Sequence, residues 1–384
     1  MKHNTENKSQ TGGKPKVAIV AELLVKMGGA ERVVKKLAEM YPEAPIYTLL
    51  YDEDFCGKDF PRQRIIASFL QKLPLFIRKR YRWLLGLMPY AIEKIDLSSY
   101  DLVISSSSAF AHGALTSSES VHICYCHSPM RYAWDYTHQY LKEKWFNPVT
   151  RWLAGGLLEK IRIWDKIAAD RPDYYIVNSE NVRKRVEKYY RLPSEVIYPP
   201  VDTVRFAMAV PGKEQKEMGD YYLMISTLAA YKKVDLAISL FNKIGKKLVI
   251  IGDGAEADFL KTMAAPNIHF KGRLSDSECA AWMAGCKAFI FPSEEDFGIS
   301  MVEAHAAGKP VLAYAAGGAL EIVKAGFNGE LFAEQSLESL EDGLGRLIVN
   351  YPNYRAKEIC AEAHKFSEKN FEKQFREMVK LKCS

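Results

Sequence analysis

The sequence of 384 residues lacks any apolar run close to the roughly 20 residues that a helix needs to cross a bilayer. Its first residues, MKHNTENKSQTGGKPK, also lack the apolar segment of a secretory signal peptide. Seven cysteines occur without a repeated zinc-ligand spacing, and Cys124 and Cys126 alternate along VHICYCHSP, which is typical of a buried strand. These absences exclude a predicted membrane span and a disulfide scaffold. We therefore expect a cytoplasmic chain with reduced thiols and no zinc site.

Positive charge is in only slight excess, with a formal net charge of +6. Hydrophobic residues make up 48% and charged residues 26% of the chain, which is ordinary for a globular protein and excludes long disorder. Such a modest charge matters for a partner only where basic residues gather on one surface. We expect no nucleic acid partner.

One basic cluster does occur, in KLPLFIRKRYRWLLGLM (residues 72–88), which contains no acid. Basic, aromatic and aliphatic residues mixed in this way suit a membrane surface that carries anionic lipid. The alternative is a helix whose apolar side packs in the core while its charges are solvated. The residues expected to contact a membrane are Arg78, Lys79, Arg80, Arg82 and Trp83.

Short apolar runs alternate with helical patterns in both halves of the chain. KVAIVAE, YDLVISSSS and DYYIVNSE are examples from the first half, and YYLMIS, KLVIIGDG and KAFIFPS from the second. A composition shift to two prolines and the polar VPGKEQKEMGD marks a boundary between them. The predicted units are a disordered leader (1–15), a first domain (16–205), a linker (206–218), a second domain (219–365) and a C-terminal helix (366–384) that crosses back to the first domain.

This alternation predicts an α/β protein with two Rossmann-like domains, each a doubly wound parallel sheet covered by helices. Ligands of such sheets bind beyond the carboxyl ends of the strands. Two sheets whose carboxyl ends face one another form a central cleft for two substrates.

A cluster of carboxylates stands where a strand is followed by a helix, in KAFIFPSEEDFGISMVEAHAAG. Glu295 lies in the predicted loop and Glu303 on a helix expected to begin near Gly298, so both carboxylates can line one pocket. The N–H groups of a helix N-terminus suit a phosphate, and carboxylates accept hydrogen bonds from hydroxyls. A nucleotide sugar contains both phosphates and hydroxyls, so it matches both kinds of protein group. Acids also stabilise a helix N-terminus by about 0.3–1 kcal/mol without a ligand, and for Asp296 alone that interpretation is favoured.

The segment EEDFGISMVE resembles the signature of two glutamates separated by seven residues in the family 4 retaining glycosyltransferases, whose fold is called GT-B. The resemblance extends over nearly the whole chain, through GGAERVV, CHSPMRYAWD, VNSENVRKRVEKYY, KGRLSDSE and GKPVLAYAAGGALEIV. HSPMRYAWD together with EEDFGISMVEA is most similar to mannosyltransferases that build bacterial O-antigen and related polysaccharides. Each motif is weak alone, but their order and spacing are specific.

The resemblance implies a set of site residues. Glu295 would contact hydroxyls of the transferred sugar, Glu303 would hold the ribose diol, and Lys232 would meet the charge of the diphosphate. His127 ends a predicted strand at the cleft edge and would bind a sugar hydroxyl or place the acceptor. The implied catalytic residues are His127 and Glu295, and the implied donor-binding residues are Gly29, Lys232, Lys233, Gly272, Arg273, Leu274, Asp296, Phe297, Gly298, Ile299 and Glu303.

The chain departs from the family pattern at STLAAYKK, where Thr227 stands in place of an expected arginine. A threonine cannot neutralise diphosphate charge. We interpret Lys232 and Lys233, together with helix dipoles, as sufficient for that charge; the alternatives are weaker donor binding or a degenerate enzyme.

An Asp-x-Asp pair that holds a metal ion on the diphosphate is the remaining way to meet that charge. Asp52 and Asp54 of YDEDF have this spacing, but they stand early in the chain, away from the donor motifs. We interpret them as a solvated acidic loop and expect activity without a metal or other cofactor.

The leading functional hypothesis is transfer of a hexose, mannose from GDP-mannose, with retention of anomeric configuration. The expected acceptor is a growing, lipid-linked bacterial polysaccharide or O-antigen glycan, which would place the enzyme on the inner face of the cytoplasmic membrane. The alternatives are a UDP-sugar donor, a nucleotide-sugar epimerase, and a catalytically degenerate scaffold with the same fold.

Overall fold

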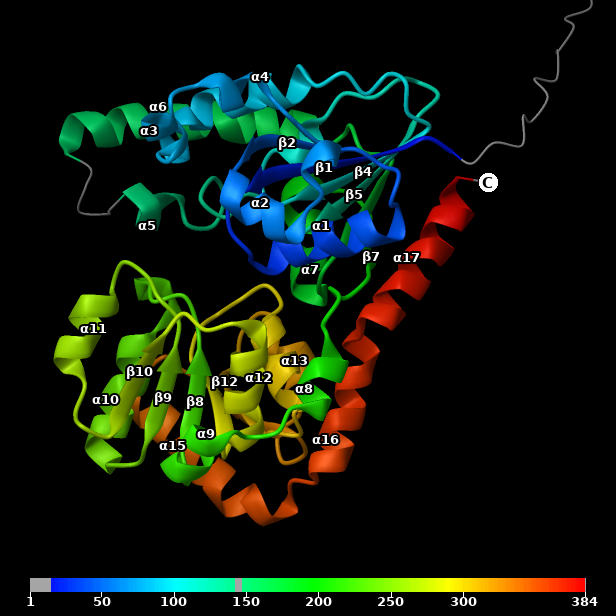
Figure 1. The fold of residues 1–384 in the computed structure, drawn as a ribbon. Helices are drawn as coiled ribbons and strands as arrows, with labels where there is room; N and C mark the ends of the chain where they lie inside the picture. The colour runs from blue at the N-terminus through cyan, green and yellow to red at the C-terminus, as the bar shows by residue number, and fades with distance from the viewer. Residues whose placement is uncertain (1–14, 142–146, 384) are drawn as a thin grey trace, which may run out of the picture.

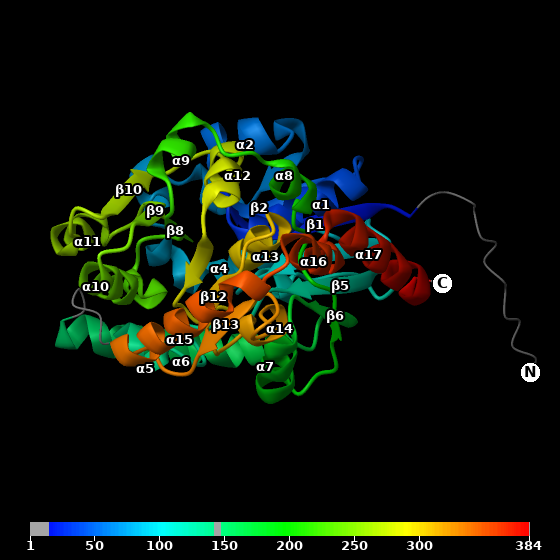
Figure 2. The same cartoon turned by 90° about the horizontal axis from the view of Figure 1, so that it is seen from below.

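The computed structural model describes residues 15–141 and 147–383, and these form two α/β domains, one above the other in Figure 1. The predicted leader lies outside the described residues except for Pro15. Figure 2 views the molecule along the direction in which the domains are stacked. The expected α/β architecture with two parallel sheets is confirmed.

The first domain contains, within the described residues, a seven-stranded parallel sheet of order β3-β2-β1-β4-β5-β6-β7. β1 lies between β2 and β4, with Ile19 opposite both Ile46 and Ile104. The strands are β1 (Val17–Leu24), β2 (Ile46–Tyr51), β3 (Ile65–Ala67), β4 (Leu102–Ser107), β5 (Val121–Cys126), β6 (Tyr174–Val177) and β7 (Glu195–Val196). The helices are α1 (Gly29–Met40), α2 (Glu53–Asp59), α3 (Leu75–Arg78), α4 (Met88–Glu93), α5 (Thr137–Leu141), α6 (Pro148–Ala168) and α7 (Glu180–Tyr190).

The second domain contains, in the part of the chain that the structure describes, a six-stranded parallel sheet of order β10-β9-β8-β11-β12-β13. The strands are β8 (Tyr222–Ile225), β9 (Leu248–Ile251), β10 (Ile268–Gly272), β11 (Ala288–Phe291), β12 (Val311–Tyr314) and β13 (Gly329–Phe332). The helices are α10 (Val234–Ile244), α11 (Ala257–Met263), α12 (Asp276–Gly285), α13 (Ile299–Ala306), α14 (Ala319–Ile322), α15 (Leu337–Asn350) and α16 (Ala356–Ala363).

Each sheet has one point where the order of its strands reverses direction, between β1 and β4 in the first domain and between β8 and β11 in the second. The strand β11, beside the reversal in the second domain, is a short apolar run in which every residue is buried. In open parallel sheets the crevice at such a reversal, beyond the carboxyl ends of the strands, is where ligands bind. The topology therefore selects one site in each domain.

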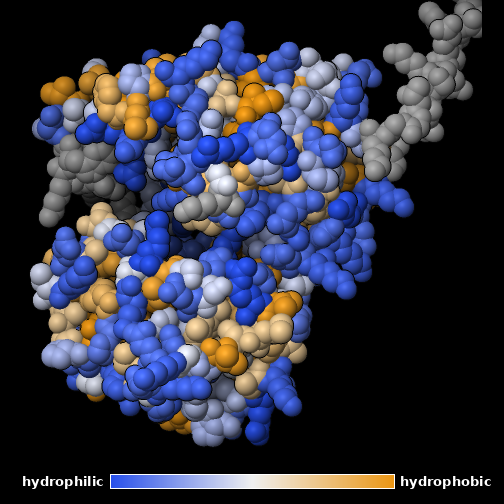
Figure 3. Space-filling view, viewed as in Figure 1, coloured by the Kyte–Doolittle hydropathy of each residue, from blue (hydrophilic) through white to orange (hydrophobic). Residues whose placement is uncertain are grey.

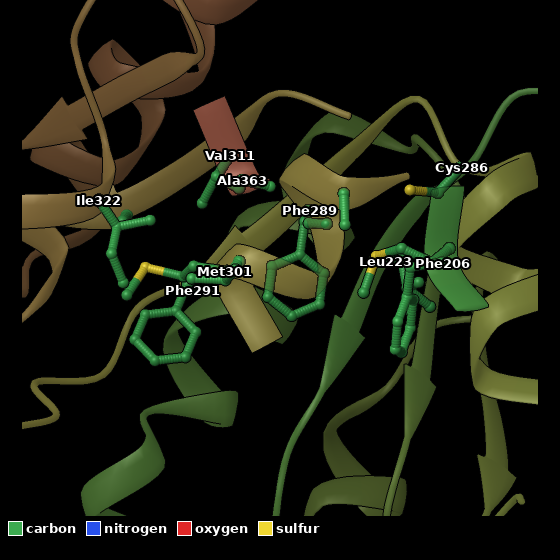
Figure 4. Packing of buried hydrophobic residues seen from close by; sticks show 14 of the residues in the cluster. Phe206, Leu223, Cys286, Phe289, Phe291, Met301, Val311, Ile322 and Ala363 are labelled. Carbon is green, nitrogen blue, oxygen red and sulfur yellow. The ribbon is translucent and has the colours of Figure 1, made fainter. Parts of the chain in front are cut away.

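The core of the second domain fixes α13 against its sheet. Phe289 and Phe291 of β11 pack with Met301 of α13 and with Val311 of β12, as Figure 4 shows. All of these side chains are buried. A helix held in this way presents its N-terminus and its remaining side chains in a defined orientation.

The C-terminal residues return to the first domain. α17 (Glu368–Lys382) runs upward along the side of both domains in Figure 1. Phe371, Phe375 and Met378 are buried in the first-domain core, and Lys36 of α1 forms an ion pair of 3.0 Å with Glu368. The helix therefore ties the end of the chain to the domain in which the chain began.

Residues 206–218, predicted to be a linker, are instead largely helical and belong to the second domain. They contain the end of α8 (Thr203–Met208) and α9 (Lys213–Met218). Phe206 is buried with Trp282 and Phe289 in the second-domain core, and Gln215 of α9 is also buried. The polar composition of this segment reflects the solvated side of short helices, which a composition argument does not distinguish from extended chain.

Candidate active site

A cavity of about 790 Å³ lies between the two domains at both strand-order reversals. From the first domain it is lined by residues that follow β1, β4, β5 and β6, such as Gly29, Ser108 and His127. From the second it is lined by residues that follow β8, β9, β10 and β11, such as Lys232 and Glu295. The cleft expected from the two facing sheets is thus formed by the carboxyl ends of both.

The loop after β11 and the start of α13 form the floor of this cavity. Gly298 precedes the helix with φ of +93°, a conformation that favours glycine, and a Cβ atom here would lie 2.4 Å from the Met301 side chain. The first N–H groups of a helix have no partner within the helix. Phe297, Gly298 and Ile299, which were predicted to present N–H groups to a donor, all line the cavity.

Glu303 of α13 lies in the same cavity, with a side chain only 8% exposed. Its Oε1 atom accepts a hydrogen bond of 2.6 Å from Nη1 of Arg32, which belongs to α1 of the first domain. Burial raises the pKa of the Glu303 carboxyl above its ordinary value, and the Arg32 guanidinium acts in the opposite direction. Arg32 also lies 3.2 Å from Asp276, so one arginine joins two acids across the cleft.

Glu295, in the loop before α13, forms an ion pair with Lys232. Both side chains are largely buried and both line the cavity. The carboxylate predicted to bind sugar hydroxyls and the ammonium predicted to meet the diphosphate therefore lie in contact with each other. A ligand that carries both hydroxyls and negative charge can bind both partners of this pair, because its hydroxyls can donate to Glu295 and its negative charge can pair with Lys232.

His127 follows β5 at the edge of the cavity, and its Nε2 atom lies 2.8 Å from Oγ of Ser106. Burial lowers the pKa of His127 to about 4, so the imidazole is neutral at pH 7. A neutral imidazole can donate one hydrogen bond and accept another, which suits a sugar hydroxyl.

Gly29 brings the first domain into direct contact with the donor loop of the second. A Cβ atom at Gly29 would lie 3.2 Å from Cδ1 of Ile299, the first residue of α13. The absence of a side chain at Gly29 therefore leaves room for the Ile299 side chain in the cleft, and the donor-binding role implied for Gly29 stays a prediction.

Most of the residues implied by the resemblance meet in this cavity, although their roles stay predictions. Lys233 and Gly272 are not among its described lining residues. Gly272 ends β10 with φ of +68°, and the turn it makes brings Arg273 and Leu274 to the cavity wall. Thr227, which replaces an expected arginine, also lines the cavity.

Two cationic side chains from the first domain were not predicted. Arg32 of the GGAERVV motif and Arg131 of the HSPMRYAWD motif both line the cavity. The sequence argument used these motifs only as marks of the family and of the histidine. Arg32 was a usable signal, because a basic residue beside a glycine-rich turn at a sheet edge is well placed for an anion.

The Asp52 and Asp54 pair lies away from this cavity. Asp52 caps α2, because its Oδ1 atom accepts hydrogen bonds from the N–H groups of Asp54 and Phe55. This is the usual structural role of an aspartate before a helix.

The basic stretch forms a surface on the first domain. Trp83 is 67% exposed, and Leu75 and Phe76 are also exposed, whereas Leu84 and Met88 pack in the core. The stretch therefore has one side packed in the core and one exposed basic and apolar side, and its contact with a membrane stays a prediction. Lys79, Arg80 and Arg82 are exposed, while Arg78 is half-buried.

A second set of exposed apolar side chains adjoins this stretch and was missed. Trp152 of α6 is 77% exposed, and Val149 and Leu153 beside it are also exposed. Gly86 lies against Leu157 of α6, so the two segments are neighbours. Figure 3 shows apolar side chains gathered over this part of the first domain. Within the described residues, no helix is long and apolar enough to cross a membrane.

Two family models match the chain. The model described as "Glycosyltransferase Family 4" matches residues 27–205, and the one described as "Glycosyl transferases group 1" matches residues 209–366. Together they account for both domains and for the cavity between them. The chain belongs to the family 4 glycosyltransferases.

Similar curated proteins include two from bacteria. A GDP-mannose-dependent alpha-mannosyltransferase of Corynebacterium glutamicum is 32% identical over 140 residues, which are 36% of this chain and 33% of that protein. A GDP-mannose-dependent alpha-(1-6)-phosphatidylinositol monomannoside mannosyltransferase of Mycobacterium tuberculosis is 28% identical over 180 residues, 41% of this chain and 47% of that protein. The matched parts thus span between a third and a half of these relatives.

Solved structures share the fold over nearly the whole chain. HepE of Anabaena, in complex with UDP and glucose, has a TM-score of 0.69 at 18% identity, with 96% of this chain and 100% of that chain covered. WaaG, a glycosyltransferase of lipopolysaccharide biosynthesis, has a TM-score of 0.60 at 18% identity, with 91% and 95% covered. The fold is GT-B, as predicted.

Proposed function

We propose that the protein is a retaining glycosyltransferase that moves a hexose from a nucleotide sugar to a growing glycan. The observation that carries the proposal is the convergence of Glu295, Glu303, Lys232 and the N-terminus of α13 in one cavity between the domains. Acceptors for hydroxyls and groups that stabilise negative charge stand together there, as a sugar attached to a diphosphate requires.

In the proposed transfer, the bond from the anomeric carbon to the diphosphate breaks and a bond to the acceptor oxygen forms on the same face of the sugar. The departing diphosphate oxygen takes the acceptor proton, so the products are a nucleoside diphosphate and the extended glycan. Lys232 stabilises the charge that develops on the leaving group. Arg131 supplies further positive charge in the same cavity, because Asp296 is already paired with Arg185, and it compensates in part for the threonine at position 227.

The donor we propose is GDP-mannose, since the two bacterial relatives named above carry that donor in their names. A panel of GDP- and UDP-sugars incubated with the protein alone tests this, because a transferase hydrolyses its donor slowly without acceptor. We expect hydrolysis of GDP-mannose. If the protein hydrolyses a UDP-sugar and not GDP-mannose, the proposed donor changes but the enzyme class stays the same. Formation of an isomeric nucleotide sugar would indicate an epimerase. Binding without turnover on any acceptor would indicate a degenerate scaffold.

We expect transfer to proceed without a metal ion. Lys232 and the N-terminus of α13 take the place that a divalent cation has in other diphosphate sites. The measurement is the rate of sugar transfer before and after treatment with EDTA, which we expect to be essentially unchanged. Complete loss, restored by magnesium or manganese, would contradict this.

The acceptor we propose is a lipid-linked bacterial polysaccharide or O-antigen glycan, reached at the anionic inner face of the cytoplasmic membrane. The support is the exposed basic and apolar surface made by residues 75–83 and the start of α6. Each basic residue near an anionic surface contributes about 1 kcal/mol, and the effect falls off within a Debye length. Several together sustain reversible binding that salt weakens.

Replacing Arg78, Lys79, Arg80 and Arg82 together by glutamine is expected to abolish sedimentation with vesicles that contain anionic lipid. Donor hydrolysis should continue, because the surface lies outside the cavity between the domains. The fraction of protein that pellets with the vesicles, at low and high salt, is the measurement.

A matched control removes the same charge from the second domain, by glutamine at the exposed Lys213, Lys216, Lys243 and Lys246. This variant should still pellet with the vesicles. Equal pelleting of both variants and of the unchanged protein would show that the basic stretch does not hold the membrane.

A further inference from the structure

The aspartate beside Glu295 is engaged by the opposite domain. Oδ1 of Asp296 lies 2.9 Å from Nη1 of Arg185 and accepts a hydrogen bond of 3.2 Å from Nδ2 of Asn181, and both of these residues belong to α7 of the first domain. Arg131 approaches the other carboxylate oxygen at 3.7 Å. Arg185 and Asp296 are each only 12% exposed, so this contact is shielded from solvent.

Arg185 is itself oriented by the motif that follows His127. Asp135 of HSPMRYAWD forms an ion pair with Arg185 and accepts a hydrogen bond from the hydroxyl of Tyr189. The motif therefore supplies Arg131, which approaches Asp296 directly, and Asp135, which holds Arg185 against it. The motif therefore acts on Asp296 of the second domain in two ways, directly through Arg131 and indirectly through Asp135, which holds Arg185.

A second contact fixes α7 to the same domain. The carboxylate of Glu321 accepts hydrogen bonds of 2.9 Å and 3.0 Å from the backbone N–H groups of Glu180 and Asn181, the first two residues of α7. A carboxylate is favourable at a helix N-terminus. The helix that carries Arg185 is therefore held against the second domain at two points.

Asp296 needs a cation for a physical reason. It lines the cavity next to Glu295, where a donor would bring a diphosphate, and an uncompensated carboxylate there would repel that charge. Paired with Arg185, the carboxylate is neutralised and the short loop between β11 and α13 is restrained on one side. Glu295 is the residue immediately before Asp296 in that loop.

We propose that Arg185 is a positioning residue for sugar transfer, which through Asp296 sets the loop of Glu295 against the first domain; this rests on the proposed function. Most of the implied nucleotide contacts belong to the second domain, whereas His127 and Arg185 belong to the first. Loss of the contact should therefore slow transfer more than it weakens binding of the nucleotide.

The test is a double-mutant cycle with Arg185→Gln and Asp296→Asn. We expect each single variant to lower kcat for transfer roughly tenfold or more, since a charge-assisted hydrogen bond is lost, while the Kd for GDP measured by calorimetry changes little. The double variant should be no slower than the slower single one, because both changes remove the same contact. Arg185→Lys, which keeps the charge, should recover part of the rate.

Arg183→Gln is the matched control, since Arg183 lies on the same helix and forms an exposed ion pair with Glu180, three residues earlier in that helix. It should leave kcat unchanged. Independent effects that multiply in the double variant, unchanged kcat in folded Arg185→Gln, or an equal loss of GDP binding would each overturn the proposal. Glu295→Gln measured alongside separates this from failure of the proposed function, because full activity there would remove the site assignment itself.

Discussion

Glu295→Gln is expected to lower the rate of sugar transfer roughly ten- to more than a hundredfold, because a charge-assisted hydrogen bond contributes about 1.5–3 kcal/mol. The substitution keeps the size of the side chain and removes its charge. It therefore removes the carboxylate that we expect to accept hydrogen bonds from the transferred sugar, and it also leaves Lys232 without its partner. The measurement is kcat for transfer together with the midpoint of thermal unfolding.

Glu294→Gln is the control for this change. Glu294 is the preceding residue, is half-buried, and is not among the described residues that line the cavity. We expect its kcat to match that of the unchanged protein. Full activity of Glu295→Gln with an unchanged unfolding midpoint would contradict the assignment of Glu295 to the transferred sugar.

Glu303→Gln is expected to act on donor binding, because we assign this carboxylate to the ribose diol. The Kd for GDP should rise roughly ten- to a hundredfold, as loss of charge-assisted hydrogen bonds from a buried carboxylate implies. The sharper measurement compares GDP with its 2′,3′-dideoxy analogue. The analogue has no diol, so its Kd should hardly change between the two proteins.

The ion pair between Glu303 and Arg32 offers another explanation that the same measurements can exclude. If Glu303 acts only by holding Arg32, then Arg32→Gln should weaken binding of GDP and of its dideoxy analogue by the same factor as Glu303→Gln. Our assignment instead requires that Arg32→Gln preserve the preference for GDP over the analogue. An equal loss for both nucleotides in Glu303→Gln would remove Glu303 from the ribose.

Several features of the site were predictable because local sequence determines them. The glycine before α13 is needed for a backbone with φ of +93°, and the helix after it follows a buried strand within a few residues. The spacing of Glu295 and Glu303 across that turn places both of them in one cavity. Period and composition sufficed for these features, since each depends on contacts between near neighbours in the chain.

Other features depended on contacts that no local pattern contains. Residues 206–218 were assigned to a linker, but they include short helices, and Phe206 packs in the second-domain core. The apolar side of α6 was missed because exposure is decided by what packs against a helix. Trp152 is exposed whereas Leu158 of the same helix is buried.

The sequence by itself determined that the chain forms two parallel-sheet domains, and it determined the family, through the order of motifs that each occupy one loop or turn. Tertiary structure alone decided how the first domain completes the site. Arg32 lies 271 positions from Glu303, and Arg185 lies 111 positions from Asp296. The physical reason is that an ion pair depends on distance in space, which is set when two sheets are packed and closed against each other, whereas the periodicity of a strand or helix is set within a few residues.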